Sequence, residues 1–270
     1  MVLVAEIVHD ILKLMATFQT HAPGSFCLFE LSTPDQAAAK RFYTSLFGWV
    51  CSDNHKSPVG VYTMFTLDSR DVAGAYTQFK RQTADGIPPY WDIYISVTSV
   101  DETAKKAAEL GGKVVMAPFD VSTYGRMAVI RDPTGATFCI WEPRTIIGVE
   151  TKNEPGSFCW VDLITQDPDT AAKFYTGLFG WTLLPGEGGY LHLKNGEDFI
   201  GGIPPAHPGA PPHWMSYVQV KDCDETVAKA RELGANILVE PMPIGTVGRM
   251  CVLKDPQGAA FALFEATAPM

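Results

Sequence analysis

The apolar and polar positions of this chain follow two different periods in turn. Apolar residues at every second position predict strands, and apolar residues three and four apart predict helices. Residues 23–31 predict a strand, and the stripe formed by Ala38, Phe42 and Leu46 predicts a helix that ends near Gly48. From residue 23 onward the chain therefore begins with a strand followed by an amphipathic helix.

Polar residues mark the start of that helix. Thr33 is predicted to be its N-cap, with Pro34 at the first helical position and Gln36 completing a capping box. Short β-like runs follow at residues 59–67 and 72–79. One strand, one helix and further strands thus form a first structural unit.

A second unit of the same kind follows. A strand is predicted over residues 90–97, and Ser99 caps a helix that runs to Gly111. The Asp-Pro-Thr-Gly turn at residues 132–135 leads into a last strand at 136–141. Each unit has the predicted order β-α-β-β-β.

The whole arrangement is then repeated. The octapeptide FYTSLFGW of residues 42–49 recurs as FYTGLFGW at residues 174–181, and the Asp132-Pro133 pair recurs as Asp255-Pro256. We therefore predict an α+β fold of four βαβββ units in two pseudo-repeated domains. The expected segments are an N-terminal extension at 1–22, a first domain at 23–147, a linker at 148–154 and a second domain at 155–266.

The N-terminal extension lies outside the repeat. Ile7, Ile11, Leu14 and Phe18 fall at helical spacing and predict one amphipathic helix. Such a helix could dock on the body of the protein or form a dimer contact, so both a monomer and a homodimer stay open.

Composition narrows the possible partners. The chain has 270 residues, 46 % of them apolar, and a net charge of −9. Such a chain can bury full cores, and its acidity disfavours nucleic acid and anionic membranes, which need clustered Lys and Arg. No apolar run has the length of a membrane span. A small-molecule ligand or substrate is the expected partner.

The cysteines and the first residues indicate a cytoplasmic protein. None of the six cysteines forms a Cys-x-x-Cys motif, and Cys27 and Cys159 are repeat equivalents inside apolar runs. Glu6, His9 and Asp10 do not fit the basic start of a signal peptide. A reducing compartment is therefore expected.

The combination of these motifs resembles the vicinal oxygen chelate superfamily, which includes glyoxalase I, bleomycin-resistance proteins and extradiol dioxygenases. The resemblance rests on the four units, the Phe-Tyr-x-x-Leu-Phe-Gly-Trp helix end and the Asp-Pro-x-Gly turn, and covers residues 23–266. It implies that two units close into an incomplete barrel around one cavity, with the helices outside. Two domains then imply two cavities.

The resemblance also implies a divalent metal. Members of the family hold it with a His or Gln in the first strand of a unit and a Glu seven residues after the Asp of the Asp-Pro-x-Gly turn. The corresponding positions are Leu28, Asp92 and Cys139 in the first half and Trp160, Met215 and Ala262 in the second. Leu, Trp, Met and Ala cannot ligate such a metal. No metal and no other cofactor is therefore expected, and a metal enzyme with displaced ligands is the alternative.

Strand parity predicts which side chains face each cavity. If Leu28 points inward, so do Phe26 and Glu30, and Cys27 and Phe29 lie against the helix. The same parity turns Phe158, Trp160 and Asp162 inward in the second half. Candidate ligand-binding residues are Leu28, Tyr94, Trp141, Trp160, Tyr217, Phe264 and His192.

Three carboxylates are candidate catalytic groups. Glu30, Asp162 and Asp92 would each lie in an aromatic cavity, where burial raises the pKa of a carboxyl and suits it to acid-base catalysis. The alternative is a structural carboxylate that accepts backbone or tyrosine hydrogen bonds. His192, two residues after Tyr190, could reach the second cavity or lie at the surface.

Three functions are compatible with this sequence. The first is a metal-independent lyase, isomerase or cyclase that acts on a small organic molecule by acid-base chemistry. The second is a binding protein of the bleomycin-resistance kind, which sequesters an apolar or aromatic compound. The third is a glyoxalase or dioxygenase whose metal ligands have moved. The fold alone cannot choose among them.

Overall fold

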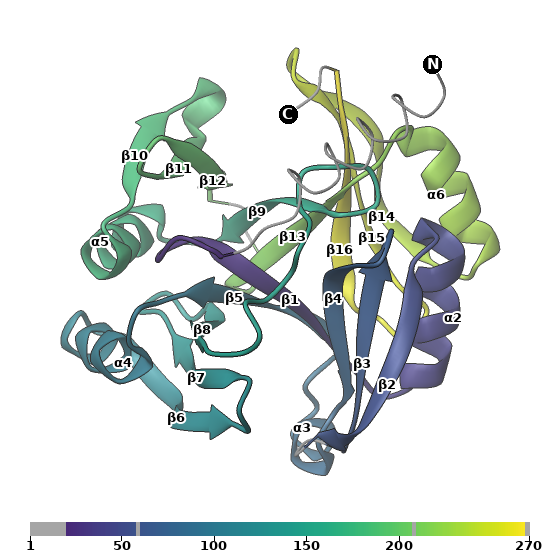
Figure 1. Cartoon of the computed structure of the whole chain (residues 1–270). Helices are drawn as coiled ribbons and strands as arrows, with labels where there is room; N and C mark the ends of the chain where they lie inside the picture. Colours follow the sequence, from purple (N-terminus) through teal and green to yellow (C-terminus); the bar gives the residue numbers. More distant parts are fainter. Residues whose placement is uncertain (1–19, 58–59, 207–208, 268–270) are drawn as a thin grey trace, which may run out of the picture.

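The computed structural model describes residues 20–57, 60–206 and 209–267, and each half of the chain forms one eight-stranded sheet (Figure 1). The strand orders are β2-β3-β4-β1-β5-β8-β7-β6 and β10-β11-β12-β9-β13-β16-β15-β14. The first sheet contains β1 (Phe26–Thr33), β2 (Val50–Ser57), β3 (Gly60–Leu67), β4 (Arg70–Thr77), β5 (Tyr90–Ser96), β6 (Lys113–Val121), β7 (Gly125–Arg131) and β8 (Thr137–Pro143). The second contains β9 (Phe158–Ile164), β10 (Thr182–Pro185), β11 (Leu191–Asn195), β12 (Asp198–Ile203), β13 (His213–Gln219), β14 (Asn236–Ile244), β15 (Gly248–Lys254) and β16 (Ala260–Ala266).

The helices complete the repeat. They are α2 (Gln36–Phe47), α3 (Lys80–Ala84), α4 (Val100–Glu109), α5 (Pro168–Phe179) and α6 (Cys223–Glu232), with a 3₁₀ turn at Glu187–Gly189. The predicted N-terminal helix falls almost wholly in residues 1–19, outside the described residues. No helix in the described part of the chain is both long and apolar enough to cross a membrane.

The predicted fold class is confirmed: the protein has two pseudo-repeated α+β domains. In the first domain β1 pairs in parallel with β4 and antiparallel with β5, and β9 pairs in the same way with β12 and β13. Neither sheet closes into a barrel, but the first curls. Asn54 on β2 donates to the Tyr124 hydroxyl beside β7 at 3.2 Å, although β2 and β7 lie near opposite edges of the sheet.

The first helix begins later than predicted. Its N-cap is Asp35 rather than Thr33, because the Asp35 carboxylate accepts the backbone N–H of Ala38 at 2.9 Å. Gln36 does not complete a capping box; its buried amide donates to Thr63 and to the Ala75 carbonyl. A polar residue at a helix start can bond to the sheet instead of the backbone, and the sequence does not distinguish the two.

The repeated octapeptide joins the two domains. The Tyr43 hydroxyl, at the end of α2, donates to Asp255 at 3.0 Å, and the Trp91 indole donates to the Tyr43 oxygen at 3.1 Å. The second copy mirrors this, because Tyr175 donates to Asp132 at 3.0 Å. Each octapeptide therefore hydrogen-bonds the Asp-Pro-x-Gly turn of the other domain.

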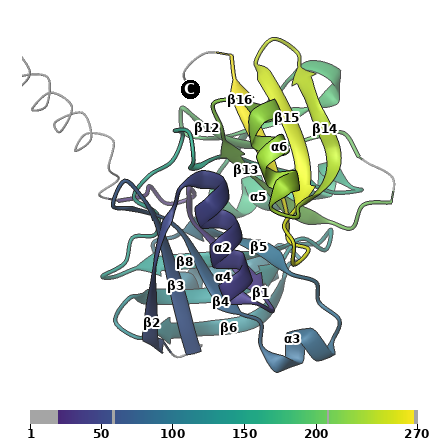
Figure 2. The ribbon, with the colours of Figure 1, turned by 90° about the vertical axis from the view of Figure 1, so that its right-hand side faces the viewer.

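The helices pair across the same junction. Helix α2 lies beside α6 and helix α4 beside α5, on opposite sides of the molecule (Figures 1 and 2). At the centre, the rings of Phe29 and Phe158 stack with centroids 4.0 Å apart. One continuous apolar core thus spans both domains and fixes how they meet.

Candidate functional site

Two carboxylates lie next to each other in the first domain. Glu30 on β1 and Asp92 on β5 are register partners, so their side chains project from the same face of the sheet at about 5 Å between Cβ atoms. Only 8 % of Glu30 and 9 % of Asp92 is exposed. Two acids removed from water at this distance repel each other whenever both are charged.

Four phenols surround this pair. The Tyr94 hydroxyl donates to Glu30 Oε2 at 2.6 Å, and Tyr62 also hydrogen-bonds Glu30. Tyr90 and Tyr76 hydrogen-bond Asp92. Each carboxyl group thus keeps polar partners although it is buried.

Burial sets the ionisation of the two acids. It raises the pKa of Glu30, and the hydrogen bonds from Tyr94 and Tyr62 oppose that rise. Burial raises the pKa of Asp92 well above its usual range, and the Glu30 charge raises it further. The pair therefore titrates as a coupled unit, in which the charge of one acid opposes the ionisation of the other.

This coupling predicts a pH-dependent gain in stability on replacing Asp92 by asparagine. Because both folded-state pKa values exceed the unfolded ones, the folded protein binds more protons, and its stability falls as pH rises above about 4. Asp92→Asn should match the unchanged protein at pH 3.5 and exceed it by at least about 1 kcal/mol at pH 7. Urea unfolding across this range measures the difference. Glu197→Gln, at a fully exposed side chain, is the control, and equal pH profiles for Asp92→Asn and the unchanged protein would refute the coupling.

The second domain carries a different cluster at the same place. Asp162 accepts hydrogen bonds from Tyr217 at 2.8 Å, from Tyr190 at 2.5 Å and from the Trp160 indole at 3.1 Å. Burial raises its pKa. Met215 replaces the second acid as the register partner of Asp162. This site therefore has one carboxyl group where the first has two.

His192 borders the second cluster. Its ring centroid lies 4.9 Å from that of Tyr190 and 5.6 Å from that of Phe199, and its Nδ1 is buried without a hydrogen-bond partner in the described structure. As the repeat predicts, Met64 is its counterpart, because Met64 pairs with Gly74 as His192 pairs with Gly202. His192 therefore borders the second site, and the first site has a methionine in its place.

The sequence analysis did not identify Tyr62 on β3, Tyr76 on β4 or Tyr190 in the loop before β11 as site residues. It also did not identify the two glycines that leave room for the Tyr62 and Tyr190 hydroxyls. A Cβ on Gly74 would lie 2.0 Å from the Tyr62 hydroxyl oxygen, and one on Gly202 would lie 1.8 Å from that of Tyr190. Both glycines are register partners of the carboxylates Glu30 and Asp162. A glycine in the middle of a strand was the available signal.

Two residues predicted to face the cavities point elsewhere. The pairing of β1 with β5 is irregular between Phe26 and Leu28, and a matching irregularity occurs at Phe158. The Phe26 ring packs against Trp181 and Trp214 of the second domain, and Phe158 packs against the first. A β-bulge inserts one residue and so breaks the alternation on which the parity argument depends.

An aromatic cavity lies between the domains, beside these bulges. It has a volume of about 430 Å³ and is lined by the aromatic residues Phe26, Phe29, Phe158, Trp160 and Phe199 together with polar ones that include His21, Lys152 and Asp198. Because Trp160 also donates to Asp162, the cavity adjoins the second carboxylate cluster. One aromatic hollow thus lies at the junction, a place at which the sequence did not predict one.

The remaining predicted residues lie on the carboxylate faces. Leu28 is the register partner of Tyr94, and Trp160 of Tyr217. Trp141 packs edge-on against Tyr94, with ring centroids 6.3 Å apart, and Phe264 lies over Gly248.

Exposed apolar side chains extend the first face to its edge. The pairing runs from Trp141 through Met127 to Phe119, and from Cys139 through Val129 to Met116. Phe119 is 38 % exposed and Met116 is 44 % exposed. An apolar surface open to solvent therefore leads to the buried acids.

Of the three positions at which the related fold would hold a metal in the first domain, Asp92 alone carries a good donor, its carboxyl group, and one such donor does not make a metal site. Leu28 is apolar, and burial raises the pKa of the Cys139 thiol well above its usual range, so the thiolate that a metal requires is disfavoured. In the described residues no three His, Cys, Asp or Glu side chains gather into a metal-binding group. The residues present do not fit such an ion.

Comparison with known proteins agrees with this fold. The family model "Glyoxalase/Bleomycin resistance protein/Dioxygenase superfamily" matches residues 26–140 and 157–263. CFP32 of Mycobacterium tuberculosis, which its name marks as a candidate glyoxylase, is 43 % identical over 87 % of this chain and 92 % of its own length. The anthracycline biosynthesis protein DauV of Streptomyces sp. (strain C5) is 36 % identical over 90 % of this chain and 94 % of its own length. The Mn(II)-bound glyoxalase of Novosphingobium aromaticivorans shares the fold at a TM-score of 0.63 and 15 % identity, covering 92 % of this chain and 86 % of that one.

Proposed function

Because this chain belongs to the glyoxalase/bleomycin resistance protein/dioxygenase superfamily, we propose that it is an enzyme that moves protons on a small aromatic molecule without a metal. The observation that carries this proposal is the pair of buried acids, Glu30 and Asp92, on adjacent strands beneath an open apolar surface. Two coupled carboxyl groups supply an acid and a base within reach of one substrate.

The hydrogen bonds of the two acids suggest their roles. The Tyr94 hydroxyl donates to Glu30 and favours its charged form, so in this proposal Glu30 acts as the base, which removes a proton from a carbon beside a carbonyl group. Asp92 keeps its proton and donates it toward the carbonyl oxygen, so that an enol forms and no charge accumulates. Return of a proton at another carbon, or departure of a leaving group, completes an isomerase or lyase reaction.

The donor set supports the proposal of metal independence. A metal in this fold would polarise the substrate oxygen; here the protonated Asp92 is the hydrogen-bond donor that we propose for that oxygen, because the Tyr94 hydroxyl already donates to Glu30. The substrate class rests on the aromatic rings of Tyr94 and Trp141 beside the acid pair and on the similarity to DauV, whose name connects that protein with anthracycline biosynthesis. A polycyclic aromatic ketone is the substrate we propose.

A second candidate function is sequestration. The aromatic cavity of about 430 Å³ at the domain junction adjoins a site with a single carboxyl group, Asp162, and favours binding without reaction. Binding and turnover would then belong to different domains of the same chain.

The proposed function predicts metal-independent turnover of an aromatic ketone. A panel of hydroxylated anthraquinones and simpler aromatic ketones should contain a compound that the protein converts, followed by absorbance and mass spectrometry. Dialysis against EDTA should change the rate less than about twofold, because no step uses a Lewis acid. Loss of turnover with EDTA and its recovery with Mn²⁺ or Zn²⁺ would support the metal enzyme instead. Binding without conversion would support sequestration.

A further inference from the structure

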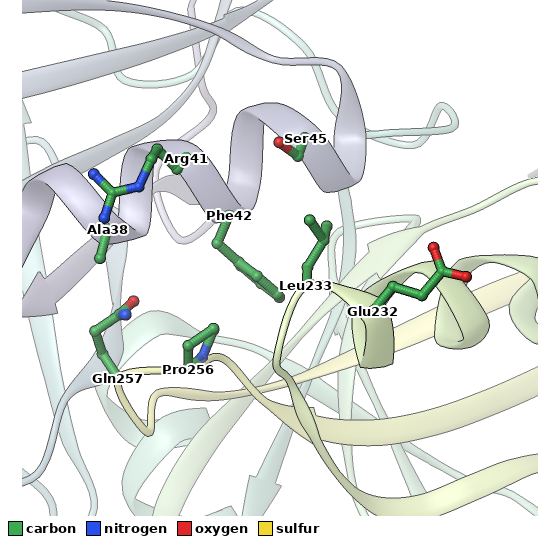
Figure 3. A pocket seen from close by; sticks show the side chains of 8 residues that line it. All are labelled: Ala38, Arg41, Phe42, Ser45, Glu232, Leu233, Pro256 and Gln257. Atoms are coloured by element: carbon green, nitrogen blue, oxygen red, sulfur yellow. The ribbon is translucent and has the colours of Figure 1, made fainter.

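The short helix α3, in the segment 78–89 between β4 and β5, is held differently from the longer helices (Figure 1). Helices α2 and α6 pack through apolar side chains, and Phe42 of one lies by Leu233 at the end of the other (Figure 3). None of the α3 residues Lys80–Ala84 is buried, and Gln82 alone among them is half-buried. The contacts of Gln82 are therefore the ones that attach α3 to the domain.

The Gln82 side chain joins α3 to two tyrosines of the first site. Its oxygen accepts the backbone N–H of Phe79 at 2.8 Å, which fixes the orientation of the amide. Its nitrogen donates to the hydroxyl oxygens of Tyr90 at 3.0 Å and Tyr76 at 3.4 Å. The Phe79 ring also packs on the Tyr76 ring, with centroids 5.6 Å apart. Helix α3 thus lies on the two phenols that hydrogen-bond Asp92.

These contacts decide where the two hydroxyl protons point. A phenol has one proton to donate, and the Tyr76 and Tyr90 oxygens lie 3.5 Å apart, so one hydroxyl can donate to the other instead of to Asp92. Because the Gln82 amide donates to both phenol oxygens, both hydroxyl protons stay available to Asp92. Burial and the Asp92 charge raise the pKa of both hydroxyls, so both keep the proton that they donate.

The corresponding positions of the second domain differ together with the second acid. By strand register and sequence, Pro204 stands at the place of Tyr76 and His213 at that of Tyr90. Met215 stands at the place of Asp92. The segment after β12, residues 204–212, is also shorter than the segment 78–89. The two phenols and the longer segment thus occur in the domain that has the second acid.

We propose that Gln82 is a positioning residue for Asp92, because it keeps both phenol protons directed at that carboxyl group. This role rests on the proposed function, in which Asp92 gives its proton to the substrate oxygen. The two phenols stabilise the negative charge that this step leaves on Asp92. Gln82 itself does not touch the substrate; it acts through Tyr76 and Tyr90.

Steady-state kinetics, with the hydroxylated anthraquinone or simpler aromatic ketone that the protein converts, test this role. Gln82→Leu should lower kcat by roughly five- to tenfold and change KM less than about twofold. Gln82→Glu keeps the shape and the contact, but its carboxylate only accepts hydrogen bonds. It should draw the phenol protons away from Asp92 and lower kcat at least as much. Thr83→Val, at the next residue of α3, should leave kcat unchanged.

Two further measurements separate positioning from a merely structural role. In the Tyr76→Phe/Tyr90→Phe variant, adding Gln82→Leu should change kcat less than about twofold, because Gln82 acts through these phenols. The two hydroxyl protons can be assigned by NMR from their loss in Tyr76→Phe and Tyr90→Phe. In Gln82→Leu they should exchange with water at least about tenfold faster than in the unchanged protein.

The proposal is wrong if hydroxyl exchange in Gln82→Leu stays within about twofold of the unchanged protein, or if this substitution lowers kcat equally with and without the two phenols. It is also wrong if Gln82→Glu keeps the original kcat, because the contact and not the direction of the hydrogen bonds would then matter. The exchange measurement needs no turnover. Faster exchange without any turnover would contradict the proposed reaction alone, and unchanged exchange with turnover would contradict the role of Gln82 alone.

Discussion

Replacing Glu30 by glutamine is expected to lower kcat by about 10²- to 10⁴-fold while the dissociation constant of the ligand changes less than about tenfold. Glutamine has nearly the shape of glutamate, so the contact with Tyr94 and the packing around it persist. The amide cannot exchange a proton at neutral pH. Steady-state kinetics and equilibrium binding, measured on the same preparation, separate the two effects.

The controls for this prediction come from the same face and from the other domain. Tyr94→Phe removes a single hydrogen bond to Glu30 and should lower kcat by less than Glu30→Gln does. Asp162→Asn tests whether the second domain also turns over substrate. If Glu30→Gln keeps its turnover within tenfold, and Leu28→Ala or Trp160→Ala weakens binding more, the protein binds its ligand without acid-base chemistry at Glu30.

Replacing both Tyr43 and Tyr175 by phenylalanine is expected to lower the free energy of unfolding by about 4–6 kcal/mol. Each hydroxyl donates to a buried aspartate of the other domain, Asp255 or Asp132, and accepts from a tryptophan indole. Phenylalanine keeps the ring packing and leaves these groups unpaired. Each single variant should lose about half of the total, because the two hydrogen-bond sets share no residue.

Urea unfolding measures this loss, and Tyr124→Phe is the matched control. Tyr124 accepts one hydrogen bond from Asn54 and is partly exposed, so its loss should cost under about 1 kcal/mol. A double variant within 1 kcal/mol of the unchanged protein would show that these hydrogen bonds do not stabilise the junction. If the loss occurs in a separate early transition, the domains separate before they unfold.

The two carboxylate faces show how one repeated design can diverge. Asp92 of the first domain is Met215 in the second, and Met64 of the first is His192 in the second. The strands, registers and mid-strand glycines remain the same. Methionine at the place of Asp92 is therefore enough to change a site with paired acids into one with a single acid, without altering the fold.

The sequence alone determined the repeat and the fold class. Alternation along the strands and the helical stripe through Phe42 are local patterns, and a second copy at Phe174 doubles each signal. Strand β2 was not located from the sequence, because it lacks such a local pattern. It lies at a sheet edge with mixed polar composition, so no buried face imposes a period on it.

The tertiary structure decided what the motifs do. Tyr43 and the Asp255 turn bond across the domain junction, and nothing in a linear sequence pairs residues so far apart. The bulges at Phe26 and Phe158 turn these rings out of the predicted cavities, because one inserted residue reverses the alternation of side chains between the two faces of a strand. The position of a bulge depends on how whole strands pair, which a single strand's sequence does not show. The sequence identified Glu30 as a candidate catalytic acid or base. The tyrosines that hydrogen-bond its carboxylate come from strands that only the folded sheet brings together.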